Sequence, residues 1–156
     1  SRLADGDMRG QLLGFATDGI SVEKAIHQSF LNGHEHEDAV PTATCLLYTS
    51  YLKSQSYSPV EVEMAAVLPC FLVYQRVGEA IVKEAEMETN PYSRWIETYS
   101  DRQFAESTIQ AVAICDRLAE ETTHANRRQM TEAFVMGTRM EYLFWESAYN
   151  MEKWKI

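Results

Sequence analysis

A cysteine and a tyrosine stand one helical turn apart near the middle of the chain, at Cys70 and Tyr74. Side chains at this spacing share one face of a helix, so the thiol and the phenol would point the same way. Pro69 comes directly before the cysteine, and a proline inside a helix bends it at a cost of roughly 3 kcal/mol. Two interpretations follow: a thiol nucleophile with a phenol beside it, or a buried apolar cysteine and a core tyrosine on a kinked helix.

Glu141 supplies a carboxyl group at a position where the helical period predicts a buried side chain. A carboxylate between apolar side chains needs hydrogen bonds or loses its charge, and this is the environment that a general acid or base requires. The alternative is a structural glutamate paired with an arginine or a hydroxyl group. The small and aromatic residues that share its face are Phe134, Gly137, Phe144, Trp145 and Ala148.

The chain is rich in aromatic side chains with polar tips, with eight tyrosines and three tryptophans. Such side chains line pockets for flat rings, and they also fill ordinary helical cores. The pocket hypothesis involves Tyr48, Tyr51, Tyr74, Tyr92, Trp95, Tyr99 and Tyr142.

Histidines and carboxylates occur together in two places. The segment 34–38, His-Glu-His-Glu-Asp, contains ligand types that bind zinc or nickel, but alternating ligands in a loop leave the geometry undefined, which favours a solvated acidic turn. Glu23 and His27 stand four residues apart, which suits either a metal-binding pair or a simple polar pair on one helix face.

Helices must position these residues, because apolar residues recur with a helical period along the whole chain and no hairpin turn separates alternating strands. With 156 residues, the chain is long enough for one domain. The sequence therefore predicts a single all-α bundle of five or six helices. The predicted helices cover 12–30, 41–52, 59–87, 91–99, 101–119 and 124–151, and the first is expected to stop at Asn32-Gly33.

The composition narrows the choice of partners and compartment. Fourteen basic against 23 acidic residues give a formal net charge of −9, which is unfavourable for binding nucleic acid or an anionic membrane surface. Three cysteines without a C-x-x-C pair suit a reducing compartment. No apolar run approaches the ~20 residues of a membrane helix. The chain starts with Ser1 and has no leader sequence, so we expect it to begin inside a longer native sequence.

Four ordered segments, spanning about residues 20–154, resemble the signatures of one enzyme family. They are Pro41-Thr42 with Tyr48-Thr49-Ser50-Tyr51, Leu68-Pro69-Cys70 with Tyr74, Pro91-Tyr92 with Trp95-Ile96 and Thr98-Tyr99, and Glu141 with Phe144-Trp145 and Ala148-Tyr149. The family is TenA, the thiaminase II enzymes or aminopyrimidine aminohydrolases. Cys70 makes the chain similar to the cysteine-containing branch.

The resemblance implies an all-α, heme-oxygenase-like fold in a cytoplasmic homotetramer that needs no metal or organic cofactor. It implies that Cys70 is the nucleophile and that Glu141 is the acid/base residue. By the same resemblance, Tyr48, Tyr74 and Tyr99 line a pyrimidine pocket, with Phe144 packed near the ring.

The implied reaction replaces the amine, or the thiazolium of thiamine, on the exocyclic methylene of an aminopyrimidine by water. Either compound is a candidate substrate. The family's N-terminal helices, which carry a pyrimidine-binding aspartate and a further pocket aromatic, have no match here. Residues 1–156 are therefore expected to be the C-terminal portion of the family fold.

Two alternatives stay open beside this hydrolase. One is a non-catalytic protein of the same fold that binds a pyrimidine or another small ring. The other is a metal- or heme-dependent oxidase that uses histidines such as His27, His34 and His36.

Overall fold

The computed structural model describes residues 5–31 and 40–155. Within these ranges every regular element is an α-helix, which confirms the all-α prediction. The helices are α1 (Gly6–Leu31), α2 (Ala43–Gln55), α3 (Val60–Val67), α4 (Pro69–Ile81), α5 (Ser93–Ser100), α6 (Arg102–Glu121) and α7 (His124–Tyr149). The predicted stop at Asn32-Gly33 and the acidic segment 34–38 lie outside the described residues.

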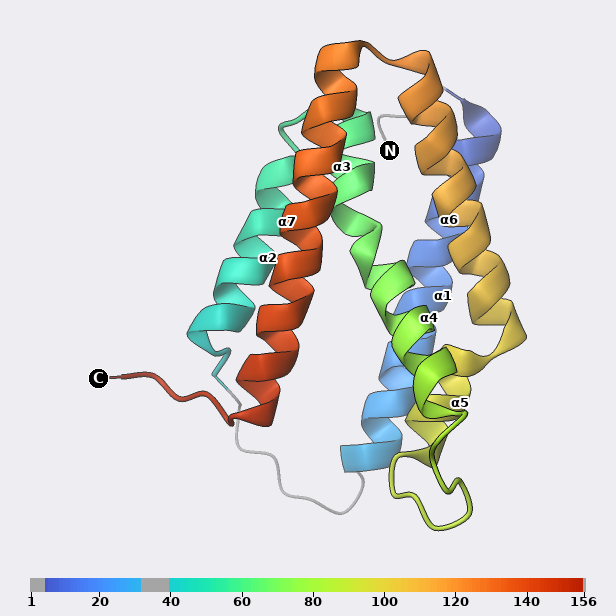
Figure 1. Ribbon diagram of the computed structural model, residues 1–156, viewed down its shortest axis with the longest axis vertical. Helices are drawn as coiled ribbons and strands as arrows, with labels where there is room; N and C mark the ends of the chain where they lie inside the picture. Colours follow the sequence, from blue (N-terminus) through green and yellow to red (C-terminus); the bar gives the residue numbers. More distant parts are fainter. Residues whose placement is uncertain (1–4, 32–39, 156) are drawn as a thin grey trace.

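The rod formed by α3 and α4 is the central element of the bundle (Figure 1). On one side α7 packs along α3 and α2, and on the other α6 packs against α3, α4 and α5. The helices α6 and α7 are joined by a short turn at one end of the molecule and spread apart toward the other, with the rod between them. The long helix α1 lies beside α6 and α4.

Pro69 divides the rod where the sequence predicted a kink. The rod follows α-helical geometry up to Val67, passes through Leu68 at φ −53° and ψ −35°, and resumes at Pro69. Since proline has no N–H, the Ala65 carbonyl cannot receive the usual helical hydrogen bond, and the rod bends there. The division also explains why residues 5–31 and 40–155 contain seven helices instead of the predicted five or six.

The second half of the rod ends earlier than predicted, at Ile81 instead of about residue 87. The following residues are mostly charged and give a continued helix no apolar face to bury. The chain instead turns toward Pro91 and α5.

The rod is apolar enough to resemble a membrane span, although the sequence showed no uninterrupted apolar run. Its 22 residues, Val60–Ile81, meet the length and composition of a spanning helix at a mean hydropathy of 1.2. In the window with this hydropathy 33% of the residues are buried, and its buried side chains contribute to the core with α6 and α7. The buried cluster consists of Val62, Ala65, Ala66, Leu68, Ala111, Cys115, Met130 and Ala133.

Gly137 allows α7 to approach the break in the rod. A Cβ atom at this position would lie 2.6 Å from the Ala66 carbonyl oxygen and 3.0 Å from Cγ of Pro69, closer than real Cβ atoms come. Glu141 follows one turn later on the same face of α7. The close approach therefore brings Glu141 toward the beginning of α4, where Cys70 lies.

Gly78 likewise allows α4 and α5 to approach each other closely. A Cβ atom there would lie 2.7 Å from both the carbonyl carbon and the carbonyl oxygen of Tyr99. This contact holds α5 against the second half of the rod and places the Tyr99 ring 4.9 Å from the Tyr74 ring, measured between centroids.

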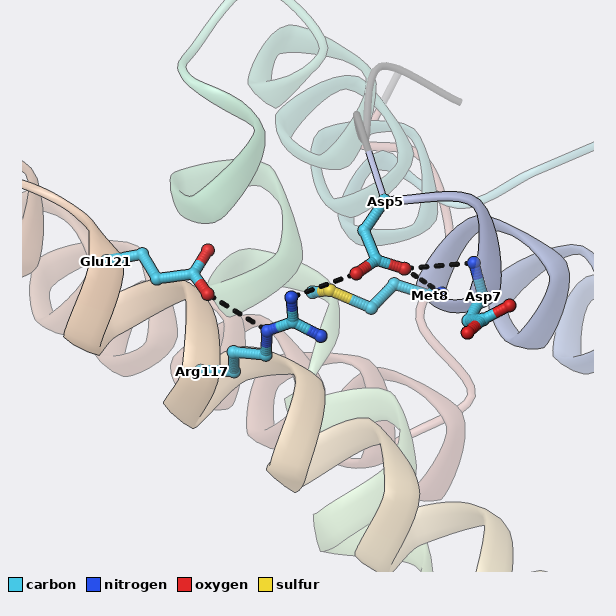
Figure 2. Close-up of polar contacts among 5 residues, drawn as sticks. All are labelled: Asp5, Asp7, Met8, Arg117 and Glu121. Carbon is cyan, nitrogen blue, oxygen red and sulfur yellow. Dashed lines mark hydrogen bonds and ion pairs between the residues drawn. The ribbon is translucent and has the colours of Figure 1, made fainter.

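The N-terminus of α1 is attached to α6 by a chain of charged contacts (Figure 2). Asp5 accepts hydrogen bonds from the backbone N–H groups of Asp7, at 2.9 Å, and Met8, at 3.0 Å. Its other oxygen lies 2.9 Å from Arg117, which also contacts Glu121 at 2.9 Å. These hydrogen bonds and the Arg117 charge hold the pKa of Asp5 below its ordinary value.

Candidate active site

Cys70, Tyr48 and Glu141 form a continuous hydrogen-bonded chain. The Tyr48 phenol donates to Oε1 of Glu141 at 2.5 Å, and its oxygen lies 3.0 Å from Sγ of Cys70. A phenol has a single proton. Either atom could be the donor in the contact between Tyr48 and Cys70, and because the phenol proton goes to Glu141, we infer that the thiol donates. The direction of the chain is thus from thiol to phenol to carboxylate.

Three different elements supply these residues. Cys70 is the second residue of α4, directly after the break at Pro69, and Tyr48 lies in the middle of α2. Glu141 is on α7, one turn after the glycine that contacts the rod. The sequence patterns predicted the buried position of Glu141, which is 2% exposed.

Burial is the main influence on the pKa values of Cys70 and Tyr48. Desolvation raises the pKa of the Cys70 thiol to about 12; a hydrogen bond that Tyr48 donates to the thiolate form opposes this rise, and the nearby Glu141 carboxylate adds to it. The Tyr48 phenol also has a raised pKa, chiefly because it is buried and then because Cys70 and Glu141 lie beside it. At neutral pH Cys70 is therefore a neutral thiol that needs a base. Oε2 of Glu141 is buried and has no hydrogen-bond partner among the described residues.

An aromatic cavity of about 570 Å³ lies next to these hydrogen-bonded residues. Its lining includes Tyr74, Tyr99 and Phe144, three of the four residues that the resemblance assigned to a pyrimidine pocket, together with Trp95 and Trp145; the fourth, Tyr48, does not line it. The rings of Trp95 and Trp145 meet edge to face, with centroids 5.5 Å apart. A volume of this size suits a small organic ligand.

Cys70, Tyr48 and Glu141 do not line the cavity themselves. Phe144 connects Tyr48 to the cavity, since it is a lining residue and its ring packs against that of Tyr48 with centroids 6.3 Å apart. Tyr74 lies one turn after Cys70, and after burial the charge of Glu141 is the largest influence that raises the pKa of its phenol. The thiol and the carboxylate are thus one side chain away from the cavity.

Glu23 is a polar wall residue that sequence reasoning did not connect with the pocket. The Tyr99 phenol donates to Oε1 of Glu23 at 2.6 Å, and Oε2 lies 3.4 Å from Nε2 of His27. The spacing of Glu23 and His27 predicted their mutual contact, which the structure shows. The contact with Tyr99 joins residues 76 positions apart, and no local pattern indicates it.

The histidine hypotheses have a limited structural basis. Among residues 5–31 and 40–155, no three His, Cys, Asp or Glu side chains gather closely enough to hold a metal ion. His34 and His36 lie outside those ranges.

The structure is a helical bundle in which a half-buried thiol and phenol contact a buried carboxyl group beside an aromatic cavity, the arrangement of a small-molecule-binding protein with a candidate nucleophile. Comparison with known proteins identifies the family: the chain belongs to the TENA/THI-4/PQQC family, whose sequence model matches residues 2–151. This confirms the resemblance found in the four ordered segments.

Individual relatives are similar over most of the chain. The aminopyrimidine aminohydrolase of Bacillus subtilis strain 168 is 31% identical over 151 residues, which are 93% of this chain and 64% of that protein. An aminopyrimidine aminohydrolase of Halalkalibacterium halodurans is 28% identical over 142 residues, 86% of this chain and 63% of that protein. The chain thus spans slightly less than two thirds of these relatives. It also matches 17% of the thiamine biosynthesis multifunctional protein ThiED of Corynebacterium glutamicum, at 29% identity.

Proposed function

We propose that the chain carries the reacting residues of a thiamine-salvage hydrolase that acts on an aminopyrimidine. The substrate has an amine, or the thiazolium of thiamine, on an exocyclic methylene group, and water replaces that group to give hydroxymethylpyrimidine. The names of the two aminohydrolase relatives support the reaction. The observation that carries the proposal is the directed chain from the Cys70 thiol through Tyr48 to Glu141.

The first step forms a thiolate only when it is needed. As the Tyr48 proton moves to Glu141, the Cys70 proton moves to Tyr48, and the sulfur adds to a ring carbon of the pyrimidine. A new C–S bond forms, and the electrons displaced into the ring expel the amine, which breaks the C–N bond at the methylene. Glu141 gives its proton to the leaving amine, which departs as ammonia.

The second step restores the enzyme. Water adds to the exocyclic methylene while Glu141 takes one of its protons, and the C–S bond breaks as the ring regains its aromatic electrons. The proton returns through Tyr48 to Cys70. The balance is one amine and one water consumed, with one alcohol and one ammonia formed. No metal or organic cofactor takes part in these steps.

The remaining predicted residues bind the ring. Tyr74, Tyr99 and Phe144 line the cavity, where stacked aromatic faces suit a flat heterocycle. Phe144 contacts the Tyr48 ring, so a ligand that displaces the Phe144 side chain would reach the thiol.

The test is the release of ammonia from an aminomethyl aminopyrimidine by the purified chain. We expect turnover by the parent and none by Cys70→Ser, which keeps the hydrogen bond to Tyr48 but loses the nucleophile. Calorimetry with the hydroxymethyl product should give similar binding for both proteins. Binding without ammonia release by the parent would identify a non-catalytic binder instead, and full turnover by Cys70→Ser would overturn the nucleophile assignment.

We further propose that the protein is a cytoplasmic homotetramer and that residues 1–156 are the C-terminal portion of the family fold. Exposed apolar side chains on α2 and α7 support self-association, because large apolar side chains on a surface mark contact sites. They include Leu46, Leu47, Val135, Tyr142 and Leu143. Light scattering during size-exclusion chromatography would measure the assembly, and a monomeric mass would contradict it.

A further inference from the structure

Glu23 and Tyr99 form a wall between two cavities. Both residues line the aromatic cavity of about 570 Å³ and a second cavity of about 410 Å³ enclosed with α6. They come from α1 and α5, and the hydrogen bond from the Tyr99 phenol to Oε1 of Glu23, at 2.6 Å, joins these helices. Tyr99 is only 6% exposed, whereas the Glu23 side chain is 50% exposed.

The direction of this hydrogen bond decides what the wall offers a ligand. Burial, and then the hydrogen bond to Glu23, raise the pKa of the Tyr99 phenol well above its usual range, so the phenol keeps its proton. That one proton is given to Glu23. What Tyr99 still has is a lone pair, and the carboxylate oxygens of Glu23 accept as well.

The aromatic neighbours keep the Tyr99 ring in place. Its centroid lies 4.7 Å from that of Trp95 and 5.2 Å from that of Phe104, which it meets edge to face. The backbone of Tyr99 is also held against Gly78. Since the ring is fixed, the only remaining freedom is the rotation of the O–H bond, and Glu23 removes it.

We propose that Glu23 is a specificity-determining residue that acts through Tyr99: by holding the phenol proton, it makes this wall accept hydrogen bonds only. The cavity therefore takes a ring that presents an N–H donor at the wall, as an amino-substituted pyrimidine does. A counterpart with a ring carbonyl in place of the amino group brings an acceptor against an acceptor and loses binding free energy. The ligand class rests on the proposed function.

The experiment measures binding rather than turnover. The ligands are the hydroxymethyl aminopyrimidine product and its counterpart with a ring carbonyl in place of the ring amino group, and calorimetry gives both dissociation constants. We expect the parent to prefer the amino compound by about tenfold, the worth of one hydrogen bond between the ring and the wall. In Glu23→Leu the phenol is free to donate, so the preference should fall by about tenfold.

Three variants separate the hydrogen bond from other effects. Glu23→Gln keeps a carbonyl oxygen that accepts the phenol proton but adds an N–H donor to the wall, so it should lose less of the preference than Glu23→Leu. Tyr99→Phe should lose as much as Glu23→Leu, and the double variant should lose no more than either single variant. Glu97→Leu is the matched control, because Glu97 is exposed on α5 and lines neither cavity.

An unchanged preference in Glu23→Leu would overturn the inference, and so would an equal loss in Glu23→Gln or additive losses in the double variant. The outcome is independent of ammonia release. If the parent binds with the expected preference but releases no ammonia, the hydrolase proposal is wrong and the inference about Glu23 stands. If the parent releases ammonia but the Glu23 variants keep its ligand preference, the inference about Glu23 is wrong and the hydrolase proposal stands.

Discussion

The buried thiol of Cys70 has the opposite electrostatic setting from a permanently activated cysteine. Reactive cysteines usually owe a low pKa to nearby positive charge, whereas burial raises the pKa of Cys70 to about 12. A thiolate standing beside Glu141 would be costly, so it should form only as its proton leaves. Tyr48 provides that route, because it contacts both groups. At the residue scale, the proposed mechanism therefore depends on the phenol as much as on the sulfur.

Replacing Tyr48 by phenylalanine tests this dependence. Tyr48→Phe keeps the ring against Phe144 but removes the hydroxyl group that joins Cys70 to Glu141. We expect kcat to fall by about 10²–10⁴-fold, the usual contribution of a positioned proton-transfer group, with little change in KM. Ammonia release under saturating and limiting substrate measures the two constants.

Tyr51→Phe is the control from the same helix. The Tyr51 phenol donates to the Ala133 carbonyl at 2.9 Å and ties α2 to α7 away from the thiol. Its loss should lower the free energy of unfolding by about 1 kcal/mol and leave kcat unchanged. Equal effects of both variants on kcat would show that Tyr48 acts only by stabilising the fold.

At the scale of the elements, local patterns could be predicted and the contacts between helices could not. The bend at Pro69 and the buried face of α7 follow from the chemistry of proline and the helical period. The close approach at Gly137 depends on how two helices pack, and its only sequence sign was a small residue on an apolar face. Glu141 reaches Tyr48 because of that approach.

Gly137→Ala should separate α7 from the rod. The added methyl group would meet the Ala66 carbonyl oxygen at 2.6 Å, and a backbone atom cannot move aside cheaply. We expect a loss of about 1–3 kcal/mol in the free energy of unfolding, measured in urea, and lower turnover because Glu141 moves away from Tyr48.

Gly14→Ala is the matched change. A Cβ atom at Gly14, within α1, would have no neighbouring atom within 4 Å. Alanine should therefore stabilise the protein, by up to about 1 kcal/mol, through its higher helix propensity. A stabilising effect at both glycines would contradict the packing argument.

The attachment of α1 through Asp5 should depend on pH. Asp5 ordinarily titrates near 3.8, and its pKa is lower in the folded protein, chiefly because Met8 N–H donates to it and also because Arg117 lies beside it. The folded state therefore favours the charged form. Its contribution to stability is present above about pH 4 and disappears as the pH falls through the lowered pKa.

Asp5→Asn isolates this contribution. Asparagine still accepts the backbone hydrogen bonds, but it loses the ionic contact with Arg117. In urea unfolding at low salt, the parent should be more stable than Asp5→Asn at pH 7, and the difference should shrink toward pH 3. Asp7→Asn, in the same turn and exposed, should show no such convergence. A difference that stays constant with pH would contradict the role of the Asp5 charge.

At the scale of the whole molecule, the cavity is a product of tertiary structure. Residues of α1, α4, α5 and α7 all line it, and their separation in sequence hides the site from any local pattern. The resemblance predicted Tyr74, Tyr99 and Phe144 because ordered motifs preserve such distant arrangements. It did not indicate Glu23, because the contact with Tyr99 is visible only when α1 is placed beside α5.

Because four helices build the cavity, a ligand should bind the folded chain and not the unfolded one. Binding of this kind stabilises a protein by about 2.7 kcal/mol at a free ligand concentration of 100 times Kd. We expect the hydroxymethyl product to raise the unfolding midpoint accordingly and to slow proteolysis within α1, whose contacts with the rest of the fold include the cavity wall. Cys70→Ser should show the same rise, since the sulfur lies outside the lining. Differential scanning fluorimetry over a range of ligand concentrations gives the midpoint. A midpoint that does not change at saturating ligand would show that the product binds elsewhere or that the cavity is not its site.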